Sequence, residues 1–137
     1  MEEKLAFLDE HYLSHFDYLD VDSVIQEQKA FGACRDVTLE YPVAENEGEE
    51  DNTYLSYNMV VGNAADSQMA MAFEVLDYAL LSAPGAPLKQ ALLDVKAGKD
   101  VYGSYDDGIL QPYFTVIAKG SNPDRKEEFV SVIRQVL

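Results

Sequence analysis

The chain has 137 residues, a formal net charge of -15 at pH 7 and 47% hydrophobic residues. This length and composition suit one globular domain, and the negative charge argues against nucleic acid and anionic membrane surfaces as partners. No apolar run approaches the roughly 18 residues of a transmembrane helix, and a single cysteine, Cys34, excludes an internal disulfide and a Cys-rich zinc site.

The first 34 residues predict a helical lead-in. Residues 2–19 carry apolar side chains at close to the 3.6-residue period of an amphipathic helix. These side chains are Leu5, Leu8, Tyr12, Phe16 and Leu19. The pattern weakens over 20–34, where VDSVIQEQ admits a short helical turn and FGAC an irregular link. Acidic residues stand where a signal peptide carries Lys or Arg, so the sequence predicts a cytoplasmic location.

Two alternating segments, 36–43 and 53–61, predict an antiparallel hairpin. Val37, Leu39, Tyr41 and Val43 share one face of the first segment. The acidic stretch ENEGEED at 45–51 is then the hairpin loop. Pro42 has no N–H for a strand ladder, so we expect it at an edge or near the strand end.

A helix pair follows. Asp66 or Ser67 can cap a helix that extends to about residue 81 and is apolar on most of its circumference, so we expect it to be heavily buried. The stretch SAPGAP interrupts it. Pro87 suits the first position of a second helix, 87–97, with Gly98 as its C-terminal cap.

A second hairpin and a final helix complete the chain. Residues 101–105 and 112–118 alternate around the turn Asp106-Asp107-Gly108. Residues 124–137 form the last helix, with Asn122 as a possible cap and Pro123 at the first position. Its apolar side chains are Phe129, Ile133 and Val136.

This order of elements predicts an α+β two-layer sandwich, in which a mostly antiparallel sheet carries helices on one face. Residues 1–34 are the helical lead-in, and residues 35–137 are the α+β core. The last helix reaches Leu137 with its apolar face still running and without a glycine cap. We therefore expect a single domain, or part of one, from a longer protein.

Both histidines fall in one motif, His11-Tyr-Leu-Ser-His15, and they are weak metal-site candidates, for which Asp22 or Glu10 is conceivable as a third ligand. Their spacing is that of zinc motifs on a helix. The activating glutamate and a third histidine are missing, so two surface histidines are favoured over a zinc site. Cys34 lacks a neighbouring base and is therefore expected to be a small buried or half-buried residue, not a catalytic thiol. Residue chemistry alone identifies no catalytic residue and no cofactor-binding residue.

Three stretches resemble the insulinase/pitrilysin superfamily of zinc metallopeptidases, in particular its presequence-protease branch. They are LSYNMVVG, the helix pair around SAPGAPLKQALLD, and LQPYFTVIAKG. The resemblance covers about 100 of the 137 residues, mainly from residue 35 onward. The inverted H-x-x-E-H motif of that superfamily is missing, and LLDVKAGKDVYGSYD lacks the arginine of its final domain, so the chain resembles the non-catalytic second domain.

The resemblance implies a non-catalytic part of a zinc endopeptidase that degrades short unstructured peptides and whose chamber wall this segment helps to form. It implies zinc in the intact parent and none in this segment. The implied partners are the other domains of the peptidase and its peptide substrate. The alternative is a stand-alone, non-enzymatic peptide-binding or assembly module of the same fold. A small zinc enzyme using His11 and His15 is disfavoured, because its general base and third ligand are missing.

Overall fold

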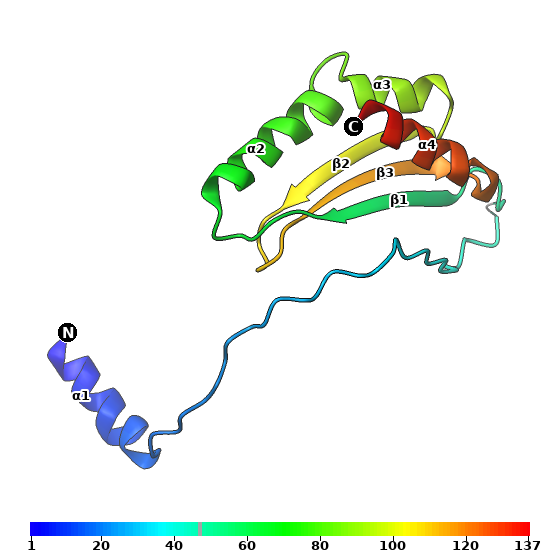
Figure 1. Ribbon diagram of the computed structural model, residues 1–137. Helices are drawn as coiled ribbons and strands as arrows, with labels where there is room; N and C mark the ends of the chain where they lie inside the picture. Colours follow the sequence, from blue (N-terminus) through cyan, green and yellow to red (C-terminus); the bar gives the residue numbers. More distant parts are fainter. Residues whose placement is uncertain (47) are drawn as a thin grey trace.

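The computed structural model describes residues 1–46 and 48–137. It contains a three-stranded antiparallel sheet in the order β1-β3-β2, formed by β1 (Thr53–Val60), β2 (Asp100–Asp106) and β3 (Tyr113–Ser121). Helices lie on one face of this sheet, and no helix covers the other face in the described residues (Figure 1). The fold is therefore α+β with helices on one side of an antiparallel sheet, as the sequence predicts.

The central strand is β3, which pairs with both neighbours. Val116 lies opposite Tyr57 of β1 and opposite Gly103 of β2. The hairpin of β2 and β3 confirms the predicted second hairpin. Alternation also predicts the sides of β3 correctly, because Phe114, Val116 and Ala118 are buried towards the helices.

The hydrophobic core lies between the sheet and the helices. Apolar side chains from β1, β2 and β3 meet those of the helical layer, and burial of their apolar surface is the main stabilising contribution. The buried core residues are Leu55, Leu81, Leu88, Leu92, Ala97, Val101, Phe114, Val116, Ala118, Phe129 and Ile133.

The helical layer contains α2 (Ser67–Asp77), the π-helical turn η2 (Tyr78–Ser82), α3 (Pro87–Asp94), the 3-10 turn η3 (Pro123–Arg125) and α4 (Lys126–Val136). The predicted N-terminal cap of α2 is confirmed, since Asp66 accepts hydrogen bonds from the backbone N–H groups of Gln68 and Met69. Pro87 begins α3 as predicted. The predicted cap of the last helix is wrong, because the Asn122 side chain makes no cap bond.

Gly98 does not cap α3, which ends at Asp94, and Lys96 adopts the positive φ of 55° after it. The expected burial of α2 is also wrong. None of its residues is buried, and Met69, Met71 and Val75 are exposed. A sheet can cover only one side of a helix, and no further element of the described residues lies on the outer side of α2 (Figure 1).

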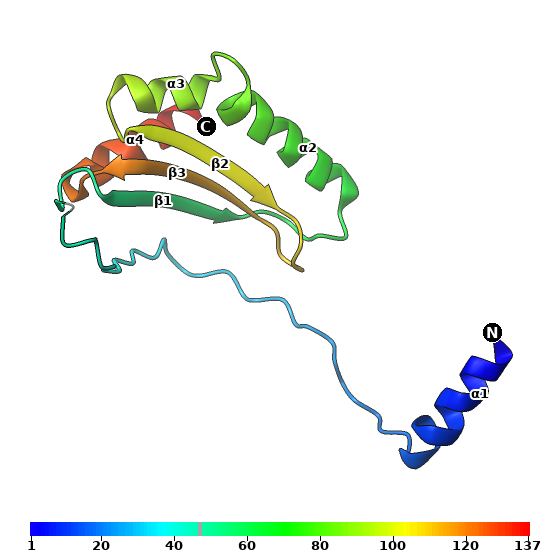
Figure 2. The same cartoon turned by 180° about the vertical axis from the view of Figure 1, so that it is seen from behind.

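The predicted helix over 2–19 is shorter in the structure. Helix α1 covers Glu2–His11, and the 3-10 turn η1 covers Leu13–His15. Residues 20–34 form neither a helix nor a strand. Helix α1 stands away from the sheet (Figures 1 and 2), so its apolar side chains receive none of the tertiary packing that stabilises most protein helices.

The predicted first hairpin is wrong, because residues 36–43 form no strand and β1 pairs with β3 instead. Val37 and Leu39 remain exposed, and the predicted hairpin loop at 45–51 includes residue 47, which lies outside the described residues. Alternation shows only that a segment suits a half-buried strand. It does not show that a neighbouring strand is available for that segment to pair with.

Candidate functional site

A polar cluster joins three loops at the start of β1. Asp51 has a φ of 59°, a conformation that Asp tolerates better than most residues. Its backbone N–H donates to Asn122 Oδ1 at 2.9 Å, and Asn122 Nδ2 donates to Asp51 Oδ1 at 2.7 Å. Lys99 Nζ lies 3.2 Å from the other carboxylate oxygen. These contacts hold the entry to β1 against the chain segments that flank the other strands.

The hydrogen bond from Asn122 and the nearby Lys99 ammonium group lower the pKa of Asp51 from its ordinary value of 3.8. Its ionised form is therefore favoured by folding. This contribution to stability is present above the unfolded-state pKa and is lost as pH falls through the lower folded-state pKa. The cluster links loops and brings together no recognisable catalytic arrangement.

We expect Asn122→Ala to lower the free energy of unfolding at pH 7, because it removes both side-chain bonds to Asp51. The loss should shrink as pH falls towards the folded-state pKa of Asp51. Urea unfolding at several pH values measures both effects, with the exposed Asn46→Ala as the matched control. A loss of the same size at every pH would contradict this account.

The two histidines lie in the N-terminal region, away from this cluster. His11 is the last residue of α1 and its ring lies 4.3 Å from that of Phe7, whereas His15 ends η1. The motif is therefore not carried on one continuous α-helix. Among the described residues no group of three or more His, Cys, Asp or Glu side chains could hold a metal ion. Cys34 is exposed, and not buried or half-buried as expected.

Asp77 is the polar group with the least favourable surroundings in the described part of the chain. It is the last residue of α2, directly before the π-helical turn η2, and its Oδ1 atom is buried without a hydrogen-bond partner. Burial raises the pKa of its carboxyl group above the ordinary value of 3.8. The charged form therefore opposes folding once pH exceeds the unfolded-state value.

We expect Asp77→Asn to raise the free energy of unfolding at neutral pH, since an uncharged amide is cheaper to bury than a carboxylate. The difference between variant and parent should grow from about pH 4 to pH 7, because folding penalises the ionised carboxylate and not the amide. Chemical unfolding at both pH values checks this, with the exposed Asp17→Asn as control. A variant less stable than the parent at pH 7 would show that the carboxylate has an unrecognised favourable contact.

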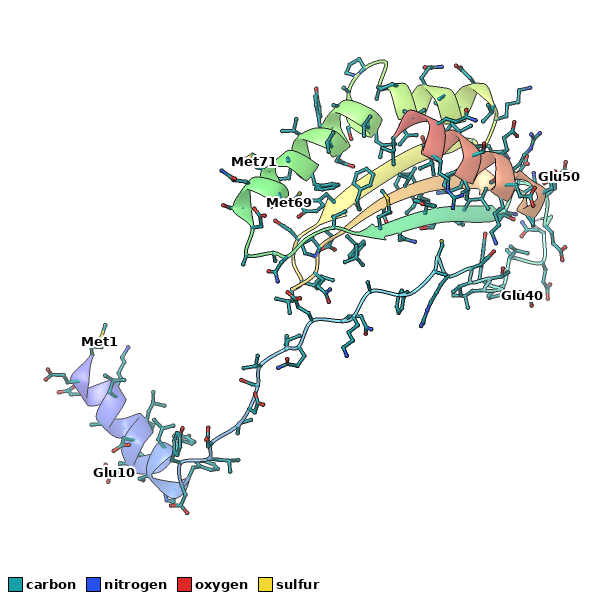
Figure 3. The ribbon with its side chains drawn as sticks, in the orientation of Figure 1. Met1, Glu10, Glu40, Glu50, Met69 and Met71 are labelled. Carbon is teal, nitrogen blue, oxygen red and sulfur yellow. The ribbon has the colours of Figure 1, made fainter. Side chains whose placement is uncertain are left out.

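Many large apolar side chains remain exposed in the first part of the chain. We call residues 1–26 the N-terminal arm; every residue in it is exposed. Its large exposed apolar residues are Met1, Leu5, Phe7, Leu8, Tyr12, Leu13, Phe16, Tyr18, Leu19, Val21, Val24 and Ile25. Figure 3 shows the arm's side chains standing clear of the sheet, with Met1 and Glu10 near opposite ends of α1. Large apolar side chains gathered on a surface are a reason to look for an interaction site.

Two open grooves flank α4. One, of about 510 Å³, lies between Asp36 and the outer face of α4 and has a mixed polar and apolar lining. The other, of about 250 Å³, is apolar and lies where Met59, Phe73 and Val136 meet. Neither groove contains a histidine or a cysteine.

The chain is similar to one part of a much longer protein. No family model matches this chain. Protein HypA from Clostridium perfringens (strain 13 / Type A) is 40% identical over 136 residues, which cover 99% of this chain. The same match covers 14% of the relative, so the chain spans about a seventh of that protein's length. Similarity at this level extends over the arm as well as the α+β core.

This relative contradicts the resemblance to the insulinase/pitrilysin superfamily, because its name is Protein HypA and not that of a peptidase, and no family model supports the superfamily. The chamber-wall function is corrected with it, as are the peptidase domains and peptide substrate expected as partners. Zinc in a parent peptidase loses its support for the same reason. The alternative of a stand-alone module is also unsupported, since the match is to part of a far longer protein.

Sequence reasoning missed the residues that the structure brings together. The sequence pattern places Asp51 in an acidic loop and Asn122 at a helix cap, because nothing local signals that they bond to each other across 71 positions. The helical pattern of the arm predicts an apolar face but does not indicate whether another segment covers that face. The exposure of the arm therefore does not follow from the pattern. In the described residues no helix has the length and apolar character needed to cross a membrane.

Proposed function

We propose that this chain is a structural part of a longer protein, in which the N-terminal arm packs against polypeptide outside these 137 residues. The observation that carries the proposal is the complete exposure of the arm despite its many large apolar side chains. Burial of apolar surface is worth about 25 cal/mol per Å². An arm of this composition therefore gains stability when another surface covers it.

Two further observations support the proposal. The relative Protein HypA shares the arm and the core with this chain but is about seven times as long. The core, in contrast, has its own buried apolar centre with side chains from all three strands and from the helical layer. The arm is thus the part that lacks a covering surface within these 137 residues. A cytoplasmic location remains a prediction.

The test begins with the native polypeptide. An antibody raised against residues 53–137 should detect, in the source cells, a polypeptide much larger than 15.3 kDa. A native polypeptide of 15.3 kDa would contradict the proposal.

Cross-linking of that longer polypeptide then tests the role of the arm. Lys4 lies in the arm and Lys119 lies on β3. We expect cross-links from Lys4 to residues beyond this chain, whereas Lys119 provides the comparison within the core. Cross-links from Lys4 to the core alone would show that the arm folds back on its own domain.

A further inference from the structure

One side of α2 carries apolar side chains that nothing in the described residues covers. Met71, Val75 and Tyr78 follow one another at i, i+4 and i+7, so they lie on the same side of the helix. They are 60–62% exposed, and Met69 and Leu76 beside them are 40% and 42% exposed. We call these five side chains the α2 face. Met71 stands on the side of α2 away from the sheet (Figure 3).

The α2 face continues into the apolar groove of about 250 Å³. Leu76 belongs to the α2 face and also lines the groove, together with Phe73 and Leu80. Met59 of β1 and Val136 near the end of α4 line its other sides, and every residue that lines it is apolar. An exposed apolar row beside an apolar groove is the kind of surface on which an amphipathic helix binds, with its anchor side chains in the groove.

The charged residues of α2 and of the loops beside it in the sequence are all acidic. No lysine, arginine or histidine occurs between Arg35 and Lys89. The charged residues of α2 and its N-terminal cap are Asp66, Glu74 and Asp77. In the described residues none of these three carboxylates forms an ion pair. The α2 face therefore lies beside negative charge that no cation of the described chain neutralises.

The effect of this negative charge reaches Tyr105, whose ring stacks on that of Phe73 at a centroid distance of 5.5 Å. Burial raises the pKa of Tyr105 above its ordinary value of 10.0, and nearby carboxylates raise it further. These carboxylates belong to Asp107, Glu74 and Asp66. Arg134, the basic residue in the last turn of α4, lines the other groove, on the outer face of α4.

Charge also argues against the two occupants that the chain itself offers. Helix α1 of the N-terminal arm has one lysine against four acidic residues, which are Glu2, Glu3, Asp9 and Glu10. A second copy of the chain would bring the same acidic α2 and a net charge of -15. Like charges that face each other across an interface cost free energy. A basic partner is therefore the one that fits the α2 face.

We propose that the α2 face and its groove bind a basic amphipathic helix, which lies in the polypeptide outside these 137 residues. Apolar side chains of this helix enter the groove, and lysine or arginine side chains on its flanks lie against the carboxylates of α2. The inference rests on the proposed function, because it requires the longer protein. It adds a second contact with that polypeptide, separate from the contact of the N-terminal arm.

A synthetic helix tests the chemistry of this surface on the 137-residue chain. The probe is a fluorescent leucine–lysine peptide of about 14 residues, the length of an ordinary protein helix, with leucine at i, i+3, i+4 and i+7. Its counterpart has glutamate in place of every lysine. Fluorescence anisotropy should show about tenfold tighter binding of the lysine peptide at low salt, and a smaller ratio at high salt. Equal affinities, or no binding of the lysine peptide, would overturn the proposal.

Val75→Lys tests the location, because it puts a positive charge in the middle of the α2 face. It should weaken binding of the lysine peptide about tenfold or more. Val37→Lys is the matched control, since it makes the same change at a valine that is 72% exposed and lies outside the helical layer. Equal affinities of the two variants for the peptide would overturn the assignment to α2.

Photo-cross-linking in the longer polypeptide tests the source of the helix. With Met71→benzoylphenylalanine, we expect cross-links to a segment outside these 137 residues that carries lysine or arginine. Cross-links to the N-terminal arm or to a second copy, or none at all, would overturn the inference. If Lys4 reaches outside polypeptide and position 71 does not, the proposed function stands and this inference fails. The opposite result would leave this inference standing and contradict the proposed role of the arm.

Discussion

Replacing Phe114 with alanine is expected to lower the free energy of unfolding by about 3–5 kcal/mol, the usual cost of removing a buried phenylalanine. Phe114 is 2% exposed, lies on the central strand and packs with its ring centroid 6.1 Å from that of Phe73. Its loss leaves a cavity between the sheet and α2 that neighbouring side chains can fill only in part. Urea unfolding followed by circular dichroism measures the change.

Phe16→Ala is the matched control, because the same substitution falls on a side chain that is 77% exposed in the N-terminal arm. We expect it to change the free energy of unfolding by less than about 0.5 kcal/mol. Equal losses in the two variants would mean that the arm belongs to the cooperative core. They would also contradict the proposal that the arm is covered by polypeptide outside the chain.

Replacing Gly103 with alanine is expected to lower the free energy of unfolding by about 1–3 kcal/mol or more, the range for an overpacked core. A Cβ atom at this position would lie 2.3 Å from the Thr115 carbonyl oxygen and 2.4 Å from Leu81 Cδ1. Neither can move freely, because Thr115 is on the central strand and Leu81 is the buried residue of the π-helical turn η2. Unfolding in urea gives the measurement.

Gly32→Ala is the control for this variant. Nothing lies within 4 Å of the position its Cβ atom would take, and its φ is not in the left-handed region. We expect no loss, and a gain of up to about 1 kcal/mol because alanine restricts the unfolded chain. If Gly103→Ala were equally neutral, the close approach of η2 to β2 would not be a feature of the native state.

The second hairpin and the helices between the two strand regions were predictable because each depends on local signals. The alternation around Asp107 and Gly108, the cap at Asp66 and the helix start at Pro87 all act within a few residues. These signals specify the local conformation of the backbone. They do not state whether a partner surface exists.

The predictions of the first hairpin and of the long N-terminal helix were wrong for that reason. Val37 and Leu39 alternate as a strand should, yet they remain exposed because β1 takes β3 as its partner. Contacts between distant residues are equally hard to predict. Spacing singles out His11 and His15, whereas the contacts of Gln111 with Gln28 and of Lys126 with Asp36 join residues 83 and 90 positions apart and have no sequence signature.

The sequence by itself determined the α+β class, the buried face of the central strand and the apolar character of the arm, because periodicity and composition are local properties. Tertiary structure alone decided which strand became the edge, which apolar side chains stayed exposed and which polar groups met. Those outcomes depend on contacts between distant segments, and a pattern that favours burial cannot specify the surface that provides it. The composition that suits one globular domain therefore describes a folded core and an arm whose apolar side chains are exposed.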